Sequence, residues 1–197
     1  MCPVSSPPIR RAAFYYASGM DAGISVRRLT KTDGGIYRAL MLRGYSEHDT
    51  AFTSTFEERA TKQVEWWTRR LQDPTSATLG AFDSSDSLIG SVRIEAYQRL
   101  RERHKTSLTA MYVMKDHASK GVGRKLLDEA LAECRRMNGI ELVNLTLTAD
   151  NLPALRLYSK VGFQSFGRES RAIKTSIGYL DKLHMWRPVS ADYVTQG

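Results

Sequence analysis

The stretch from Met111 to Met137 constrains the fold of this chain most strongly. An apolar, strand-like run leads into a short loop with two glycines, Gly121 and Gly123. After the loop, apolar residues return at helical spacing, namely Leu126, Leu127, Ala130, Leu131, Cys134 and Met137. A helix is therefore predicted to begin close to Gly123. Because the first N–H groups of a helix have no partner within it, this loop is a candidate anion site.

Two well-known nucleotide motifs do not fit this loop. A dinucleotide-binding fingerprint needs a third glycine where Leu126 stands, and a P-loop needs Gly-Lys followed by Ser or Thr, which is missing. Lys120, Arg124 and Lys125 still add positive charge beside the helix start. Taken alone, the two glycines are equally compatible with an ordinary strand-to-helix turn.

A second motif follows a further strand-like run, Glu141 to Thr148. Together the two motifs resemble the GNAT superfamily of N-acetyltransferases, and the residues that carry the likeness are Gly121, Gly123, Asn151, Ala154, Leu157, Tyr158, Lys160, Gly162 and Phe163. The resemblance extends from about Ile24 to Val189. It implies an α/β (α+β) fold in which a mixed central sheet of about seven strands is flanked by about four helices.

The domain limits follow from this match. We expect a flexible tail over residues 1–23, one acetyltransferase domain over 24–189 and a second tail over 190–197. Arg10 and Arg11 precede an apolar stretch too short for an export signal, so a plain extension is the preferred interpretation.

The resemblance also implies a cofactor site for acetyl-CoA. In this family the strand before the loop offers backbone groups to the pantetheine arm, and the loop's N–H groups bind the pyrophosphate. The implied strand residues are Met111, Tyr112 and Val113, and the implied loop residues are Ala118, Ser119, Lys120, Gly121, Val122, Gly123 and Arg124. The family usually has Gln or Arg where Ala118 stands and often Gly where Ser119 stands. Both residues keep their N–H groups, so we expect binding to survive this departure.

Acyl transfer to an amine needs an uncharged nucleophile, a stabilised oxyanion and a proton for the departing thiolate. Tyr158 matches the family's tyrosine that reaches the thioester sulfur, although it would also pack in any amphipathic helix. Asn151 is expected near the cofactor, where it holds the strand-to-helix turn. For the general base, Glu57 and Glu95 rank first, while Glu58, Asp116, His104 and a chain of water molecules stay open.

Composition limits the other function classes. A formal charge of +8 and a pI near 9.6 suit an acidic ligand. The basic residues are scattered along the sequence, which disfavours a nucleic-acid-binding protein. The two cysteines, Cys2 and Cys134, cannot build a disulfide framework, and the histidines lack metal-ligand spacing, so neither a metal nor an oxidising compartment is expected. No apolar run is long enough to span a membrane. We expect a cytoplasmic protein and leave a homodimer open.

Two helices are predicted before the first hairpin. One begins near Thr30 to Asp33, continues through Leu42 and ends at Gly44. The other follows Thr55 as N-cap and runs to Asp73-Pro74 as one helix. By resemblance these helices cover the acceptor side of the cleft.

The predicted activity is acetyl transfer from acetyl-CoA to a primary amine by direct attack in a ternary complex. The alternative is an inactive CoA-binding sensor or interaction module of the same fold. The acceptor, a small molecule or a peptide, is not fixed by the sequence.

Overall fold

The computed structural model describes residues 23–190, in which a seven-stranded sheet has the order β1-β2-β3-β4-β5-β7-β6. The strands are β1 (Ser25–Arg28), β2 (Ser76–Phe82), β3 (Leu88–Ala96), β4 (Lys105–Val113), β5 (Leu142–Thr148), β6 (Gln164–Thr175) and β7 (Gly178–Pro188). The five α-helices are α1 (Gly34–Glu47), α2 (Phe56–Ala60), α3 (Val64–Gln72), α4 (Val122–Arg136) and α5 (Leu152–Lys160). The predicted mixed sheet of about seven strands is confirmed, with one helix more than expected.

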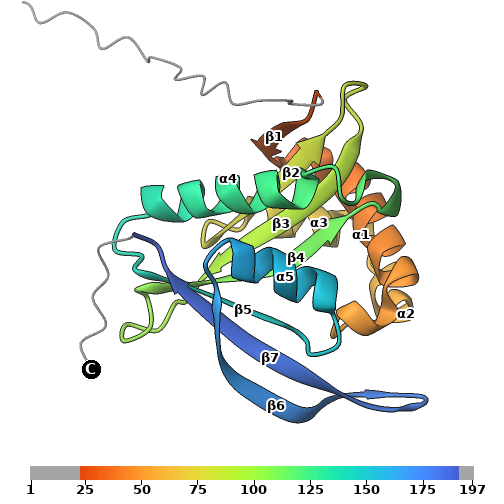
Figure 1. The fold of residues 1–197 in the computed structure, drawn as a ribbon. Helices are drawn as coiled ribbons and strands as arrows, with labels where there is room; N and C mark the ends of the chain where they lie inside the picture. Colours follow the sequence, from red (N-terminus) through yellow and green to blue (C-terminus); the bar gives the residue numbers. More distant parts are fainter. Residues whose placement is uncertain (1–22, 191–197) are drawn as a thin grey trace, which may run out of the picture.

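Helices cover the sheet in two layers (Figure 1). Helices α4 and α5 lie on one face and share an apolar cluster with β2 to β5. Helices α1 and α3 lie on the other face, where Tyr37, Met41 and Trp67 are buried against Phe82 and Tyr112. Both layers therefore meet β4, one on each side.

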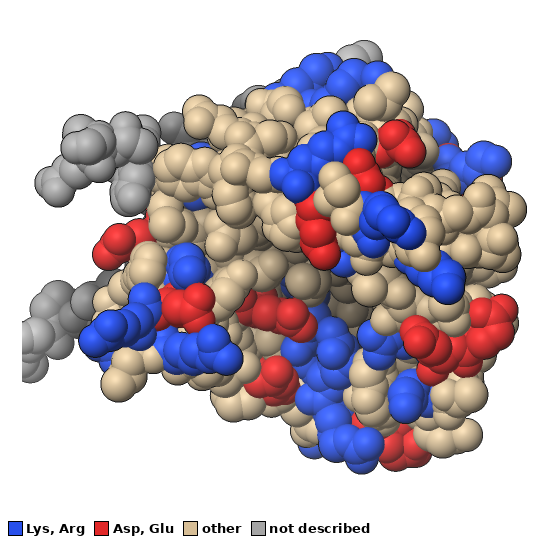
Figure 2. All heavy atoms as spheres, turned by 90° about the horizontal axis from the view of Figure 1, so that it is seen from below, with Lys and Arg blue, Asp and Glu red and all other residues tan. Residues whose placement is uncertain are grey.

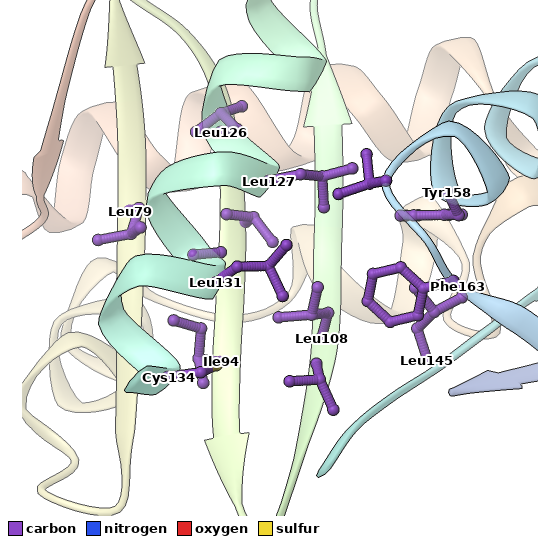
Figure 3. Packing of buried hydrophobic residues seen from close by; sticks show 14 of the residues in the cluster. Leu79, Ile94, Leu108, Leu126, Leu127, Leu131, Cys134, Leu145, Tyr158 and Phe163 are labelled. Atoms are coloured by element: carbon purple, nitrogen blue, oxygen red, sulfur yellow. The ribbon is translucent and has the colours of Figure 1, made fainter. Parts of the chain in front are cut away.

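Helix α4 packs as its sequence pattern predicts. Its apolar side chains are at most 2% exposed, namely Val122, Leu126, Leu127, Ala130, Leu131 and Cys134. Leu126, Leu127, Leu131 and Cys134 point from α4 onto β2, β3 and β4 (Figure 3). Burying such a stripe is the main source of stability for a helix of this kind, so the loop before α4 is fixed to the sheet.

Strands β4 and β5 separate part of the way along their length. They pair in parallel from Lys105 with Leu142 to Leu108 with Leu145, and the pairing stops there. Beyond this point β4 continues to Val113 beside β3, with a bulge in which Ala110 has a φ of 49°. One edge of β4 from Thr109 onward consequently has no neighbouring strand among residues 23–190.

The predicted end of the first helix at Gly44 is wrong. Helix α1 continues to Glu47, and Gly44 is buried inside it. A Cβ on Gly44 would stand 2.9 Å from Cγ of Tyr112, so the glycine lets α1 approach β4 closely. Gly44 was predicted to end the helix, but it is the residue at which α1 packs against Tyr112 of β4.

The predicted second helix is two helices in the structure. Helix α2 ends at Ala60, and α3 starts at Val64 after a short break. Thr55 is the N-cap of α2, as predicted, since its hydroxyl accepts from the N–H of Glu58 at 3.2 Å while the Glu58 carboxylate accepts from the N–H of Thr55.

The remaining predictions divide by region. Apart from Gly23 and Ser190, both predicted tails and Cys2 lie outside the described residues. Cys134 is a buried free thiol. Within residues 23–190, no helix is long and apolar enough to cross a membrane, and no cluster of His, Cys, Asp and Glu has a metal-binding arrangement.

Candidate active site

The loop before α4 is built to expose backbone N–H groups. Ser119 and Gly121 both have positive φ, 62° and 83°, and Gly121 is the N-cap of α4. No side chain caps this helix. A Cβ on Gly121 would meet nothing within 4 Å, so the loop borders open space. Alternating backbone conformations of this kind direct successive N–H groups to one side, which is the geometry of an anion site.

Gly123 brings the loop close to the other two elements of the predicted site. A Cβ at this position would stand 3.1 Å from Cδ2 of Leu157 and 3.5 Å from Cε of Met111. The start of α4 therefore touches both α5 and β4. Leu157 directly precedes Tyr158 in α5, so the glycine loop and the helix that carries the tyrosine are neighbours.

The basic residues of the loop have different surroundings. Arg124 forms an ion pair with Asp128 at 2.8 Å, and Lys125 donates to the carbonyl of Ile24 at 2.5 Å. Lys120 is exposed and makes no ion pair with another described residue. Of the three cations predicted beside the anion site, Lys120 is the one whose charge is not already engaged by a carboxylate or carbonyl in this part of the chain.

The predicted cofactor strand alternates between the two layers. Met111 and Val113 pack against the cluster of α4 and α5, whereas Tyr112 faces α1. The Tyr112 hydroxyl donates to Oε2 of Glu47 at 2.7 Å, and its pKa is raised by burial and by that carboxylate. Its side chain is thus a structural link to α1. The peptide groups of these three residues lie along the edge that β5 leaves open.

Tyr158 is buried at the junction of these elements. It is 7% exposed, and its ring meets the ring of Phe163 edge-on at 5.8 Å. The side chain points from α5 toward β4 (Figure 3). Its hydroxyl makes no hydrogen bond with another described residue, and burial raises the pKa of this phenol. A protonated donor without an internal acceptor is thereby placed beside the separated strands.

Asn151 is the N-cap of α5. Its side-chain oxygen accepts from the N–H of Ala154 at 3.1 Å, which fixes the turn between β5 and the helix. The expected holding of the strand-to-helix turn is therefore visible in the structure, while contact with a cofactor stays a prediction.

The two carboxylates ranked as general base lie in different surroundings. Glu57 is exposed in the first turn of α2, where its own N–H and the Thr55 hydroxyl keep its pKa below the usual range. Glu95, on β3, accepts from Arg93 at 2.6 Å and from Arg70 at 3.3 Å. Glu57 is thus an exposed acid at a helix start, whereas Glu95 belongs to the sheet and is held by two arginines.

One buried group had no signal in the sequence. Thr109 lies directly after the last paired residue of β4, and its Oγ1 is buried without a partner among the described residues. A threonine within a strand is unremarkable, so only the register of the sheet reveals it. Buried polar atoms normally have partners, so an unpaired one beside an open edge fits a ligand group.

These observations test whether an acyl-CoA fits the site. The loop offers uncapped N–H groups and open space for a pyrophosphate, and β4 offers an unpaired edge for an extended amide chain. Tyr158 and Thr109 add unpaired hydroxyls farther along. A hollow of about 690 Å³ at the opposite end of β3 and β4, beside Tyr97 and Ile140, is a separate feature. The fold and the site together fit a protein that binds an acyl-CoA.

Comparison with known proteins identifies the family. Residues 41–163 match the family described as "Acetyltransferase (GNAT) family", and the chain belongs to this family. It is 29% identical over 122 residues to an L-amino acid N-acetyltransferase of Escherichia coli K12, covering 61% of this chain and 74% of that protein.

Solved structures of the same family have the same fold. An acetyltransferase of the GNAT family from Streptococcus pneumoniae superimposes with a TM-score of 0.76 and 27% identity, over 84% of this chain and 99% of that one. A putative acetyltransferase from Salmonella typhimurium was determined with its cofactor acetyl-CoA. It superimposes with a TM-score of 0.71 and 19% identity, over 87% of this chain and 96% of that one.

Proposed function

We propose that this protein is an acetyl-CoA-dependent N-acetyltransferase that acetylates a primary amine by direct attack in a ternary complex. One observation carries the proposal: the glycine loop, the unpaired edge of β4 and the helix of Tyr158 converge through Gly123. Acetyl-CoA, when bound, supplies an acetyl group activated as a thioester.

Two backbone segments of the chain are proposed to bind different parts of acetyl-CoA. The N–H groups from Ala118 to Arg124 hold the pyrophosphate, with Lys120 adding charge. The peptide groups of Met111 to Val113 pair with the extended pantetheine amides along the free edge of β4. Because these contacts come from the backbone, Ala118 and Ser119 serve as well as other residue types.

Tyr158 is proposed to hold the proton that the departing thiolate takes up. Its phenol stays protonated well above neutral pH, since burial disfavours the phenolate. No internal acceptor competes for this proton among the described residues. A positioned acid of this kind contributes about 10²- to 10⁴-fold to rate.

For the removal of the amine's proton, Glu95 is the stronger of the two ranked carboxylates. It belongs to β3, opposite Ser107 on β4, and two guanidinium groups fix its position. Glu57 lies in solvent at the start of α2. A water chain from Glu95 would serve the same purpose.

Calorimetric titration with acetyl-CoA tests the cofactor assignment. We expect saturable binding, and the absence of binding at millimolar acetyl-CoA would refute the proposal.

Tyr158→Phe should lower kcat by at least about tenfold with little change in acetyl-CoA affinity. Tyr179→Phe, on an exposed tyrosine of β7, is the matched control. Equal losses of kcat and affinity in Tyr158→Phe would indicate a packing role.

The rival function is a CoA-binding module without turnover. Ala118, which replaces the family's usual Gln or Arg, is the observation in its favour. Thiol release from acetyl-CoA across a panel of amines separates the two functions, because a module would bind acetyl-CoA and release no thiol with any amine.

A further inference from the structure

Two arginines flank one tryptophan on the face of the sheet opposite α4. The guanidinium carbons of Arg59, in α2, and Arg70, in α3, each lie 5.0 Å from the ring centroid of Trp66. Stacking on an aromatic face holds a guanidinium flat while leaving its N–H edge available. Arg59 and Arg70, stacked on Trp66, are called the arginine pair below.

The positive charge of Arg59 has no carboxylate partner among the described residues. Its Nη2 donates to the Ser54 hydroxyl at 2.6 Å, and its Nε is buried without a partner. Burying part of a guanidinium is costly unless its N–H groups are satisfied. Besides Ser54, Arg59 interacts with the Tyr45 hydroxyl, so its partners among the described residues are neutral hydroxyls and no carboxylate of this part of the chain neutralises its charge.

The neighbouring charges do not supply a carboxylate for Arg59. Arg70 pairs with Glu95 at 3.3 Å, and Arg93 pairs with Glu95 and with Asp73. Three guanidinium groups therefore face two carboxylates, and the surplus positive charge resides at Arg59. An anion that enters here would meet an unpaired cation in a partly desolvated place, where charge-assisted hydrogen bonds are strong.

The arginine pair lies on the proposed acceptor side. Tyr45, near the end of α1, is buried, which raises its pKa, while the charges of Arg59 and Arg70 oppose that rise. The preceding residue, Gly44, contacts the Tyr112 ring on β4. The 3₁₀ turn η2 (Asp49–Ala51) then reaches β5. The segment after α1 thus leads from Tyr45, beside the pair, to β5.

Figure 2, which looks at the molecule from below, shows a hollow near the centre of the face. Basic side chains run from the hollow to the margin, with acidic ones close by. Aromatic side chains beside the pair, with Phe52 edge-on to Tyr45 at 4.8 Å, add an apolar wall.

We propose that the acceptor is an amine that also carries a carboxylate, and that Arg59 and Arg70 bind this carboxylate while Trp66 contacts the adjoining carbon atoms. This inference rests on the proposed function and names its substrate class. Amines whose other charges are positive, such as polyamines and aminoglycosides, would meet the surplus charge of the pair and are disfavoured.

The first test needs no mutation. The wild-type enzyme at saturating acetyl-CoA is offered a panel of L-amino acids, each beside its amide, together with spermidine, and thiol release is followed. The amide keeps the amine and the side chain but removes the negative charge. We expect kcat/KM for the preferred acid to exceed that of its amide about ten- to a hundredfold, mainly through KM. An amide or spermidine that performs equally well or better would overturn the inference.

The second test asks whether the pair causes the preference. Arg59→Gln should raise KM for the preferred acid about tenfold or more and leave its amide nearly unchanged. Arg69→Gln, an exposed residue of the same helix as Arg70, removes the same charge and should leave both acceptors unaffected. Equal effects of the two variants would overturn the assignment, because they would show only a general electrostatic influence.

Binding without turnover gives an independent readout. Calorimetry measures the affinity of the N-acetylated form of the preferred acid for the complex of the enzyme with CoA. Arg59→Gln should weaken this affinity by about the same factor by which it raises KM for the acid. Acetyl-CoA affinity and thermal stability of the variant serve as folding checks, and Arg59→Met replaces Arg59→Gln if the latter does not fold.

The failures of the two proposals are distinguishable. If acetyl-CoA does not bind, the proposed function is refuted. If acetyl-CoA binds and amides or spermidine are acetylated as well as acids, the function stands and the carboxylate subsite is refuted. Acetyl-CoA binding without turnover of any acceptor supports the inactive module and refutes the subsite.

Discussion

Replacing Gly44 by alanine tests the contact that joins α1 to β4. The added Cβ would stand 2.9, 3.0 and 3.1 Å from Cγ, Cδ1 and Cδ2 of the Tyr112 ring; the first distance is shorter than real Cβ atoms show, and the other two are tighter than most real contacts. The ring cannot easily yield, since Tyr112 is 4% exposed and its hydroxyl is bonded to Glu47 at 2.7 Å. Overpacking of this kind costs about 1–3 kcal/mol, while alanine regains about 1 kcal/mol of helix propensity. We expect a net loss of up to about 2 kcal/mol.

Gly35→Ala is the matched control in the same helix. A Cβ at Gly35 would meet nothing within 4 Å, so this variant should gain a few tenths to about 1 kcal/mol. Urea denaturation measures both variants, and the midpoint should fall for Gly44→Ala and rise slightly for Gly35→Ala at unchanged m. Acetyl-CoA affinity should fall in Gly44→Ala alone, because Tyr112 belongs to the proposed cofactor strand. Equal stability of the two variants would refute the close packing of α1 on β4.

Three further predictions concern charge and backbone. Arg27 holds the pKa of Asp33 down to about 2 through a hydrogen bond, so Asp33→Asn should lower the unfolding free energy by about 1–2 kcal/mol at neutral pH. The difference between the variant and the wild type should shrink as the pH falls from 4 to 2, which urea titrations at several pH values measure. Burial raises the pKa of Tyr37 to about 12, so the contribution of Tyr37 to stability should be constant below pH 10 and should decline between pH 10 and 12. Alkaline unfolding, followed by tyrosinate absorbance, measures this decline. Gly121→Ala should lower the unfolding free energy by about 1 kcal/mol, because alanine is strained at a φ of 83° although its Cβ touches nothing. It should also weaken acetyl-CoA binding severalfold, because the loop relieves this strain by moving its N–H groups; thermal denaturation and calorimetry measure the two effects separately.

Local patterns in the sequence were sufficient for most elements. The apolar stripe of α4, the cap at Thr55 and the turn at Asn151 all depend on residues within a few positions of each other. Interactions of this range are decided by side-chain spacing and capping chemistry, which a single sequence displays. The glycine loop was identified for the same reason.

Features that depend on distant residues were not visible. Gly44 was interpreted as a helix end because its true partner, Tyr112, is far away in the sequence. The break between α2 and α3 is likewise unmarked by proline or glycine. The stacking of Arg59 and Arg70 on Trp66 requires two helices whose mutual orientation no local pattern specifies. Tertiary contacts overrule local preference in each case.

The same reasoning explains why the loop can depart from the family's usual residues. Helices approach β4 from both faces, at Met111 and Val113 on one side and at Tyr112 on the other, and two glycines make these approaches possible. What remains between the helices is a strand edge whose peptide groups have lost their partner on β5. Because the proposed ligand-binding groups are backbone atoms held by packing, substitutions that preserve the packing should be tolerated in the loop. Substitutions that move a helix should not be, even where they lie far from the loop in the sequence.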